Sequence, residues 1–218
     1  NIPTAVAQFE VRGTDHADQF PTSDAKTTMW ENTATNNNGT DGWFTYSYYF
    51  PVGFNYPDAW YGMMQNFISP KPVQFIELRR SGTGGMCGAT GGPPLNNHIC
   101  WEYREASGNN TFNYDLGTVN EGHWTYITAY IEFRNTAVGS FKVWRSDDVL
   151  PDTSATPLVT KTGIRTLFSG ASASRTDVYQ YRGAGAASNI QLMNICGFHR
   201  AATAAASQTL PFCPVGQP

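Results

Sequence analysis

Two tyrosines late in the chain are the first residues whose type and spacing could do chemistry. Tyr179 and Tyr181 lie in the segment DVYQYR, so in a strand they share one face, and Arg182 follows directly. A phenol has a pKa of about 10 and acts as a base at neutral pH only beside a cation. The pattern therefore indicates proton transfer by Tyr179 or Tyr181, with a pair of cross-strand packing tyrosines as the alternative.

A second segment, QFIELRR, carries charges of both signs. Alternation along a strand places Glu77 and Arg79 on one face and Arg80 on the other. Arg79 could bind an acidic ligand through two parallel hydrogen bonds, because the guanidinium fork matches a carboxylate. The alternative is an intrastrand pair between Glu77 and Arg79 on a solvated face.

Four histidines could take part in acid–base chemistry, and a structural role is an alternative for each. His98 is the strongest candidate because it lies two residues before Cys100, where it could overhang a cleft with Tyr103 and Arg104. The spacing does not indicate a metal site. The other three histidines are His16, His123 and His199.

An aromatic strand is predicted at residues 123–133. Alternation divides it into an apolar face and a second face that contains Trp124, Tyr126, Tyr130 and Glu132. The apolar face is typical of a core. The other face is aromatic yet able to form hydrogen bonds, which suits a wall that packs against sugar rings and contacts their hydroxyls. We therefore expect Tyr126, Tyr130 and Glu132 to line a saccharide groove.

The composition limits the classes of partner. The chain has 218 residues, of which 40 % are hydrophobic and 14 % are charged, and its formal net charge is -3. A soluble domain usually has about 25 % charged residues, so Asn, Thr, Ser and Gly must supply much of the polar surface. No basic field would attract nucleic acid or an acidic membrane, and no apolar run reaches membrane-spanning length. We expect a monomer.

The four cysteines fall into two sequence-local pairs. We favour disulfides between Cys87 and Cys100 and between Cys196 and Cys213, among the three connectivities that four cysteines allow. Because no CxxC spacing is present, a zinc site is the weaker alternative. An even number of cysteines and a low charge content favour an oxidising compartment outside the cytoplasm.

Other features agree with secretion. Asn38 and Asn109 begin Asn-x-Thr sequons, which accept glycans in a eukaryotic host. The sequence starts at Asn1 without a basic or apolar leader, so a signal peptide, if there was one, has been removed. We expect a secreted, disulfide-bonded glycoprotein.

Short strand patterns recur along the whole chain, with turn residues such as NNNG and SGTGG between them, and helical patterns are nearly absent. This spacing predicts an all-β fold, an antiparallel two-sheet β-jelly roll of the concanavalin-A-like type. We expect a single domain over residues 1–218, with an irregular tail from about residue 201 and one helical turn near residues 166–169. The expected strands are residues 5–11, 27–31, 43–50, 61–68, 73–79, 98–104, 111–114, 123–133, 139–145, 158–162, 176–181 and 189–198.

The order of these segments resembles the jelly-roll polysaccharide lyases, the group that contains glucuronan lyase and the heparin-lyase-like enzymes. A tryptophan-bearing strand ends in Phe-Pro at residue 51, and a strand with Gln65 and a cysteine-closed loop follow. The motif GHW at 122–124 and the strand GSFKVW at 139–144 come next. The likeness covers roughly residues 42–198, and its motifs specify the fold better than the reaction.

The resemblance implies a lyase that cleaves an acidic, uronic-acid-containing polysaccharide by β-elimination. Such an enzyme neutralises the sugar carboxylate, removes the adjacent proton and protonates the leaving oxygen. Gln65 matches the family's strand-borne glutamine and would face the carboxyl group together with Arg79 or Arg182. Tyr179 or Tyr181 matches the tyrosine strand that supplies the catalytic acid.

Several alternatives stay open at this point. Phe67 stands where the family often has a histidine, which favours a non-catalytic, lectin-like module that keeps the groove and lacks the base. A jelly-roll glycoside hydrolase would need two carboxyl groups, for which Glu77 and Glu132 are candidates. We expect no cofactor to be required, although the turn at residues 147–148 and the loop with Asp15 and Asp18 could bind calcium through oxygens.

Overall fold

The computed structural model describes the backbone in eight stretches of the chain. These are residues 7–11, 25–54, 56, 61–68, 71–79, 97–105, 110–182 and 191–208. Side-chain surroundings are described for residues 36–54, 56, 61–68, 72–78, 97–105, 112–179 and 200–208.

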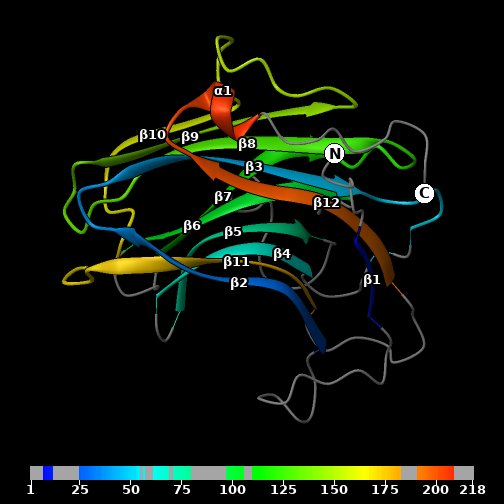
Figure 1. Cartoon of the computed structure of the whole chain (residues 1–218), viewed down its shortest axis with the longest axis horizontal. Helices are drawn as coiled ribbons and strands as arrows, with labels where there is room; N and C mark the ends of the chain where they lie inside the picture. The colour runs from blue at the N-terminus through cyan, green and yellow to red at the C-terminus, as the bar shows by residue number, and fades with distance from the viewer. Residues whose placement is uncertain are drawn as a thin grey trace.

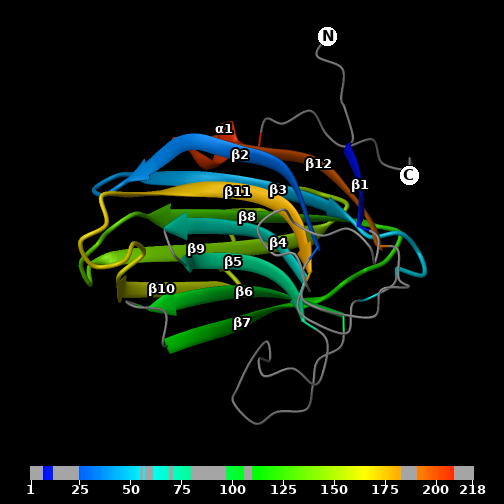
Figure 2. The same ribbon diagram turned by 90° about the horizontal axis from the view of Figure 1, so that it is seen from below.

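Two antiparallel sheets stack face to face in this part of the chain (Figures 1 and 2). Sheet A has the strand order β1-β12-β3-β8-β9-β10, and sheet B has the order β2-β11-β4-β5-β6-β7. The strands are β1 (Ala7–Val11), β2 (Ala25–Asn37), β3 (Asp41–Tyr49), β4 (Tyr61–Ile68), β5 (Lys71–Arg79), β6 (His98–Glu105), β7 (Asn110–Thr118), β8 (Trp124–Glu132), β9 (Gly139–Asp147), β10 (Val159–Ile164), β11 (Ala173–Arg182) and β12 (Gln191–Ala201).

The predicted all-β jelly roll is confirmed, and each expected strand has a counterpart with ends shifted by a few residues. The helix prediction was wrong, because residues 166–169 form bends and turns. A short helix, α1 (Ala204–Ser207), occurs instead in the tail that we expected to be irregular. The Thr203 side chain caps it by accepting a hydrogen bond from the Ala206 N–H, as N-cap threonines commonly do. The described residues include no helix that is long and apolar enough to span a membrane.

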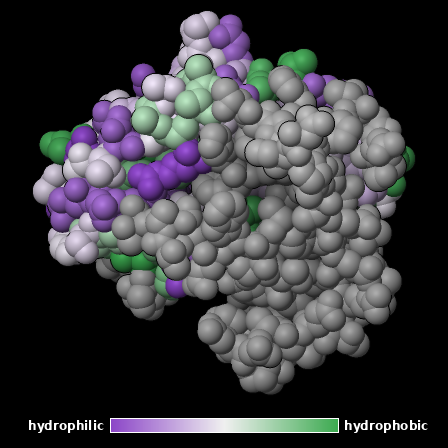
Figure 3. Space-filling view, in the orientation of Figure 1, coloured by the Kyte–Doolittle hydropathy of each residue, from purple (hydrophilic) through white to green (hydrophobic). Residues whose placement is uncertain are grey.

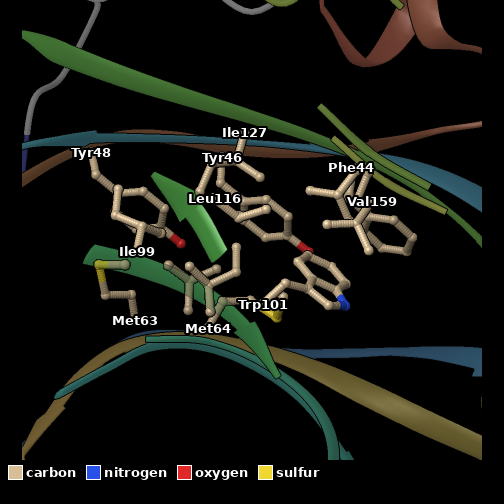
Figure 4. Close-up of a cluster of buried hydrophobic side chains, with 14 of the residues drawn as sticks. Phe44, Tyr46, Tyr48, Met63, Met64, Ile99, Trp101, Leu116, Ile127 and Val159 are labelled. Carbon is tan, nitrogen blue, oxygen red and sulfur yellow. The ribbon is translucent and has the colours of Figure 1, made fainter. Parts of the chain in front are cut away.

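The core lies between the sheets and follows the alternation predicted for β8. Ile127, Ala129 and Ile131 are fully buried in it. Met64 and Trp101 approach from sheet B, and Figure 4 shows such side chains converging between the layers. Burial of this apolar surface is the main stabilising term of the fold. On the face seen in Figure 3, the described part of the surface mixes hydrophilic side chains with smaller apolar patches.

A row of buried polar side chains crosses the inner face of sheet B. Asn36 Nδ2 donates to Thr176 Oγ1 at 2.9 Å, and Thr176 Oγ1 donates to Asn66 Oδ1 at 2.6 Å. Asn66 Nδ2 in turn donates to Gln74 Oε1 at 2.7 Å. We call these four residues, which come from β2, β11, β4 and β5, the amide ladder. Since a buried polar group is costly unless it is paired, the amide ladder fixes how these strands align.

Candidate active site

Three residues with predicted chemistry, Gln65, Glu77 and Tyr179, lie on the outer face of sheet B. Ile76 and Leu78 of β5 lie in the core, so Phe75 and Glu77 project from the opposite side of the strand. In the register of the sheet, Gln65 on β4 lies between Phe75 and Asp177 of β11. The strands β11, β4, β5 and β6 thus carry one continuous outer face.

Tyr179 and Gln65, which the sequence analysis named separately, are in contact on this face. The Tyr179 hydroxyl donates to Gln65 Oε1 at 3.4 Å, and Gln65 Nε2 donates to Asp177 Oδ2 at 2.6 Å. Arg175 Nε lies 3.2 Å from Asp177 Oδ1. Phenol, amide, carboxylate and guanidinium therefore form one connected chain from Tyr179 to Arg175.

A glycine makes the position of Tyr179 possible. A Cβ atom at Gly62 would lie 2.9 Å from both Cε2 and the hydroxyl oxygen of Tyr179, a separation that real Cβ contacts essentially never show. The tyrosine ring therefore lies directly over β4 at the one residue without a side chain. Tyr179 and Asp177 are both buried, and Gln65 is nearly so.

Two arginines lie on the same face, of which Arg175 was not predicted and Arg104 was expected only in a cleft beside His98. The Arg175 guanidinium lies 4.8 Å from the centre of the Phe67 ring, and the Arg104 guanidinium lies 4.6 Å from that of Phe75. Arg104 Nε is 2.6 Å from Glu102 Oε1, just as Arg175 is held by its own carboxylate. Each arginine is thus fixed from below by a ring and from the side by a buried acid.

These arginines keep contact with solvent while their partners do not. The Arg175 and Arg104 side chains are 40 % and 26 % exposed, whereas the Asp177 and Glu102 side chains are each 1 % exposed. Three inter-strand steps of about 4.8 Å separate β11 from β6, so the two sites are about 14 Å apart. The sequence feature that could have indicated these arginines is an acidic residue two positions away on the same strand, Glu102 for Arg104 and Asp177 for Arg175. Phe67, where the resemblance led us to expect a histidine, supports Arg175.

His98 is well oriented but lies away from this cluster. Its Nδ1 is 2.8 Å from Asp115 Oδ1, and its Nε2 is 3.1 Å from the Thr118 hydroxyl. In the sheet register, His98 lies opposite Arg79 of β5, and Gln65 lies opposite Phe75 of the same strand. Arg79 and Phe75 are four residues apart. Four strand residues and two strand spacings place His98 about 16 Å from Gln65. The structure therefore does not bring these two predicted catalytic residues together.

The remaining predictions for sheet B concern residues that are described only in part. Glu77 is buried on the outer face, where its register partners are Gly62 and Cys100. The backbones of Tyr181 and Arg182 belong to β11 and that of Arg79 belongs to β5. Their side chains lie outside the described residues, so their predicted roles remain predictions.

The aromatic wall belongs to the other sheet, so it does not share a face with Gln65 and Tyr179. Tyr126, Tyr130 and Glu132 project from the outer face of sheet A, across the core from Gln65. Tyr126 is buried in a cluster with Trp124, and this burial raises the pKa of its phenol. Alternation correctly grouped these residues on one face, but it does not identify the sheet to which the strand belongs.

The same separation excludes the proposed pair of hydrolytic carboxylates. Glu77 lies on the outer face of sheet B, and Glu132 lies on the outer face of sheet A. Stacked sheets are about 10 Å apart, and the core fills the space between them. Retaining glycosidases need their carboxyl groups about 5–5.5 Å apart and inverting ones about 6.5–9.5 Å, so this pair cannot serve in either mechanism.

Disulfide and metal predictions can be followed only in part. Cys100 is buried and disulfide-bonded. Cys87, Cys213 and the side chain of Cys196 lie outside the described residues, and so do Asp15, Asp18, His16, Asn109 and the side chain of His199. Among the residues that are described, no three His, Cys, Asp or Glu side chains form a metal-binding group.

The carboxylates of the turn considered for calcium are engaged by protein groups. Asp147 Oδ1 accepts a hydrogen bond from the Thr125 hydroxyl at 3.0 Å. Asp148 accepts one from the Trp124 N–H at 3.1 Å, and its Oδ2 lies 2.5 Å from His123 Nδ1. The His123 hydrogen bond is the largest influence that lowers the pKa of Asp148.

The chain is thus a two-sheet jelly-roll sandwich that carries a phenol, an amide and two ring-supported arginines on one outer face. The polysaccharide lyase family profile matches residues 4–176, and the chain belongs to that family. The protein is therefore a polysaccharide lyase, an enzyme that degrades polysaccharides.

Solved structures with the same fold come from several enzyme groups. The endo-β-1,4-glucuronan lyase of the fungus Trichoderma reesei is similar at 12 % identity and a TM-score of 0.53, over 93 % of this chain and 90 % of that one. The PL-14 alginate lyase of Aplysia kurodai gives 10 % identity and a TM-score of 0.52, over 90 % and 82 %.

A hydrolase shares the fold as well. The GH131 β-glucanase catalytic domain of Podospora anserina gives 13 % identity and a TM-score of 0.56, over 91 % of this chain and 72 % of that one. At such identities the likeness establishes the fold alone, and the reaction class rests on the family. No curated protein sequence matches the chain.

Proposed function

We propose that this lyase cleaves a uronic-acid-containing polysaccharide by β-elimination on the outer face of sheet B. The observation that carries the proposal is the connected chain from Tyr179 through Gln65 and Asp177 to Arg175. It places a group able to transfer protons beside groups able to bind a carboxylate. The similarity to glucuronan and alginate lyase structures agrees with an acidic substrate.

Binding of the sugar carboxylate falls to Arg175 and Gln65. An amide has two N–H groups, and Asp177 takes one of those on Gln65, which leaves the other to donate to the substrate. The planar guanidinium of Arg175 is part exposed and matches a carboxylate through two hydrogen bonds. Neutralising the carboxylate makes the neighbouring C–H more acidic, which lowers the barrier to elimination.

Tyr179 is assigned the proton transfers. Its hydroxyl is held by Gln65, the residue that would bind the substrate carboxylate, so the phenol lies next to the carbon that loses its proton. Because Tyr179 is buried, the proposal requires the saccharide to reach it on binding, and catalytic hydrogen bonds often form only in such complexes. Tyr181, on the same strand, is the second candidate for this role.

A product assay tests the reaction. The protein is incubated with polyglucuronate, alginate, heparan sulfate and a neutral β-glucan, and both ultraviolet absorbance and reducing ends are followed. Elimination gives an unsaturated, ultraviolet-absorbing sugar with each new reducing end, and only from an acidic polymer. Reducing ends without that absorbance would refute elimination, and cleavage of the neutral glucan alone would refute the substrate class.

Variants locate the site. Tyr179→Phe should abolish product formation while the melting temperature stays nearly unchanged, and Tyr181→Phe gives the corresponding test of the second candidate. Tyr126→Phe is the matched control, because Tyr126 is a buried tyrosine on the opposite sheet. Full activity in Tyr179→Phe would remove that residue from the mechanism.

We also propose that the enzyme works outside the cytoplasm as a glycoprotein. The disulfide at Cys100 is favoured only in an oxidising compartment, and Asn38 is exposed at the turn after β2. Expression in a eukaryotic host, followed by glycosidase treatment and mass spectrometry, should show glycan loss at Asn38. An unmodified Asn38 in protein recovered from the medium would contradict the glycosylation.

A further inference from the structure

The outer face of sheet A contains a cleft that the proposed reaction does not use. Its volume is about 650 Å³, and it is lined by residues of β3, β8, β9 and the end of β10. Sheet A is the upper layer in Figure 1, so the core separates this cleft from Tyr179 and Gln65. Any ligand here would bind independently of the site on sheet B.

The strand register explains why these side chains meet. Trp43 of β3, Tyr130 of β8 and Lys142 of β9 are direct cross-strand neighbours. Asp41 and Glu132 form the adjacent row. Phe44 of β3, Ile131 of β8 and Phe141 of β9, which neighbour these residues along their strands, belong to the core, so both rows project outward.

The first row provides an aromatic platform that is ordered before any ligand arrives. Trp43 is part exposed, and its ring centre lies 5.0 Å from that of Tyr130 and 5.5 Å from that of Trp144. Trp144 is in turn fixed by its indole N–H, which donates to the Ala155 carbonyl at 2.8 Å. A platform that is already rigid loses little entropy when a ligand packs against it.

The second row provides hydrogen-bond acceptors beside the platform. The Tyr130 hydroxyl donates to Asp41 Oδ2 at 2.8 Å, and the same oxygen lies 3.3 Å from Glu132 Oε1, so one proton is shared unequally between the two carboxylates at the edge of the ring. Glu132 Oε2 also accepts from the Ser140 hydroxyl at 2.6 Å. Lys142 is exposed and adds a donor on the other side.

We propose that this cleft is a second saccharide site, which binds a neutral hexopyranose oligosaccharide without cleaving it. The apolar face of a sugar ring packs on Trp43, and sugar hydroxyls donate to Asp41 and Glu132 in charge-assisted hydrogen bonds. Two carboxylates against the one ammonium of Lys142 leave the cleft with a net negative charge, which repels uronate. The site on sheet A therefore holds neutral glycan while the site on sheet B acts on acidic polymer.

Calorimetric titration of the 218-residue chain with cellohexaose, laminarihexaose and mannohexaose tests this site. At least one of these sugars should bind, and Trp43→Ala should weaken that binding about tenfold. Asp41→Asn should weaken it several-fold while keeping the shape of the cleft. Phe112→Ala, which removes an exposed aromatic side chain on β7 of the other sheet, should bind as the unaltered protein does.

Two results would overturn the proposal. One is the absence of binding by all three sugars, and the other is unchanged affinity in both Trp43→Ala and Asp41→Asn. Circular dichroism checks that Trp43→Ala folds; if it does not, Asp41→Asn and Lys142→Met decide the outcome. The rate of polyuronate cleavage should be the same in Asp41→Asn as in the unaltered protein, because the two sites lie on opposite sheets.

Discussion

Adding one methyl group at Gly62 should disturb the site on sheet B without removing any functional group. Gly62→Ala places a Cβ 2.9 Å from Cε2 and the hydroxyl oxygen of Tyr179, so the buried ring must move. Over-packing of this kind costs about 1–3 kcal/mol. For a chain of this size, each kcal/mol lowers the melting temperature by about 2–4 °C.

The effect on catalysis follows from the same displacement. The Tyr179 hydroxyl is already 3.4 Å from Gln65 Oε1, so a small shift breaks the contact. A misplacement approaching 1 Å can cost about a hundredfold in rate, and we expect a loss of tenfold or more in the ultraviolet assay. Urea unfolding measured on the same preparation gives the change in stability.

A second substitution isolates the cause. Tyr179→Leu lacks the three atoms that the new Cβ would meet, so Gly62→Ala should cost much less in a Tyr179→Leu background than in the unaltered protein. Equal costs in both backgrounds would show that the clash is not with Tyr179. Normal stability together with normal activity in Gly62→Ala would refute the placement of the tyrosine over β4.

Three further predictions concern other parts of the molecule. Arg175→Lys keeps the charge and loses the planar fork, so KM for polyuronate should rise about three- to tenfold in initial-rate measurements; an unchanged KM would place carboxylate binding elsewhere. Asp148→Asn should lower the unfolding free energy at pH 7 by about 0.5 kcal/mol or less, because the pair with His123 is largely exposed. The pKa of Asp148 is lowered in the folded chain, so this difference should vanish as the pH falls through that pKa, and a difference that persists in acid would contradict it. Asn66→Ala interrupts the amide ladder and should cost about 2–4 kcal/mol in urea unfolding, whereas a loss under about 0.5 kcal/mol would mean that water replaces the amide.

The strands could be predicted from the sequence because their signals are local. Alternation over segments such as 61–68, with glycine and asparagine at the turns, marks each strand without reference to its partners. The core face of β8 was predicted residue by residue for the same reason. The roles proposed for Tyr179 and Gln65 followed from a family resemblance and not from spacing, and their contact is a result of the structure.

The assignment of strands to sheets could not be predicted in this way. Tyr130 and Gln65 are both on outer faces, yet β8 and β4 belong to different sheets, and only long-range pairing decides that. The helix α1 was missed because its four residues form a single turn, which depends on the Thr203 cap and on packing against sheet A. The ring support of Arg104 and Arg175 was missed because each arginine needs an aromatic residue from a neighbouring strand.

The amide ladder links buried residues to the positions of the proposed catalytic residues on the outer face of sheet B. Asn66 faces inward and Gln65 faces outward on consecutive positions of β4, and Thr176 and Asp177 do the same on β11. A shift of either strand by one residue would turn its inward-facing residues outward and its outward-facing residues inward. The position of the buried amide ladder therefore fixes the position of the outer-face residues. Substitutions in the amide ladder can therefore change the catalytic activity by shifting the outward-facing residues. A redesign for a new polymer should keep the amide ladder unchanged.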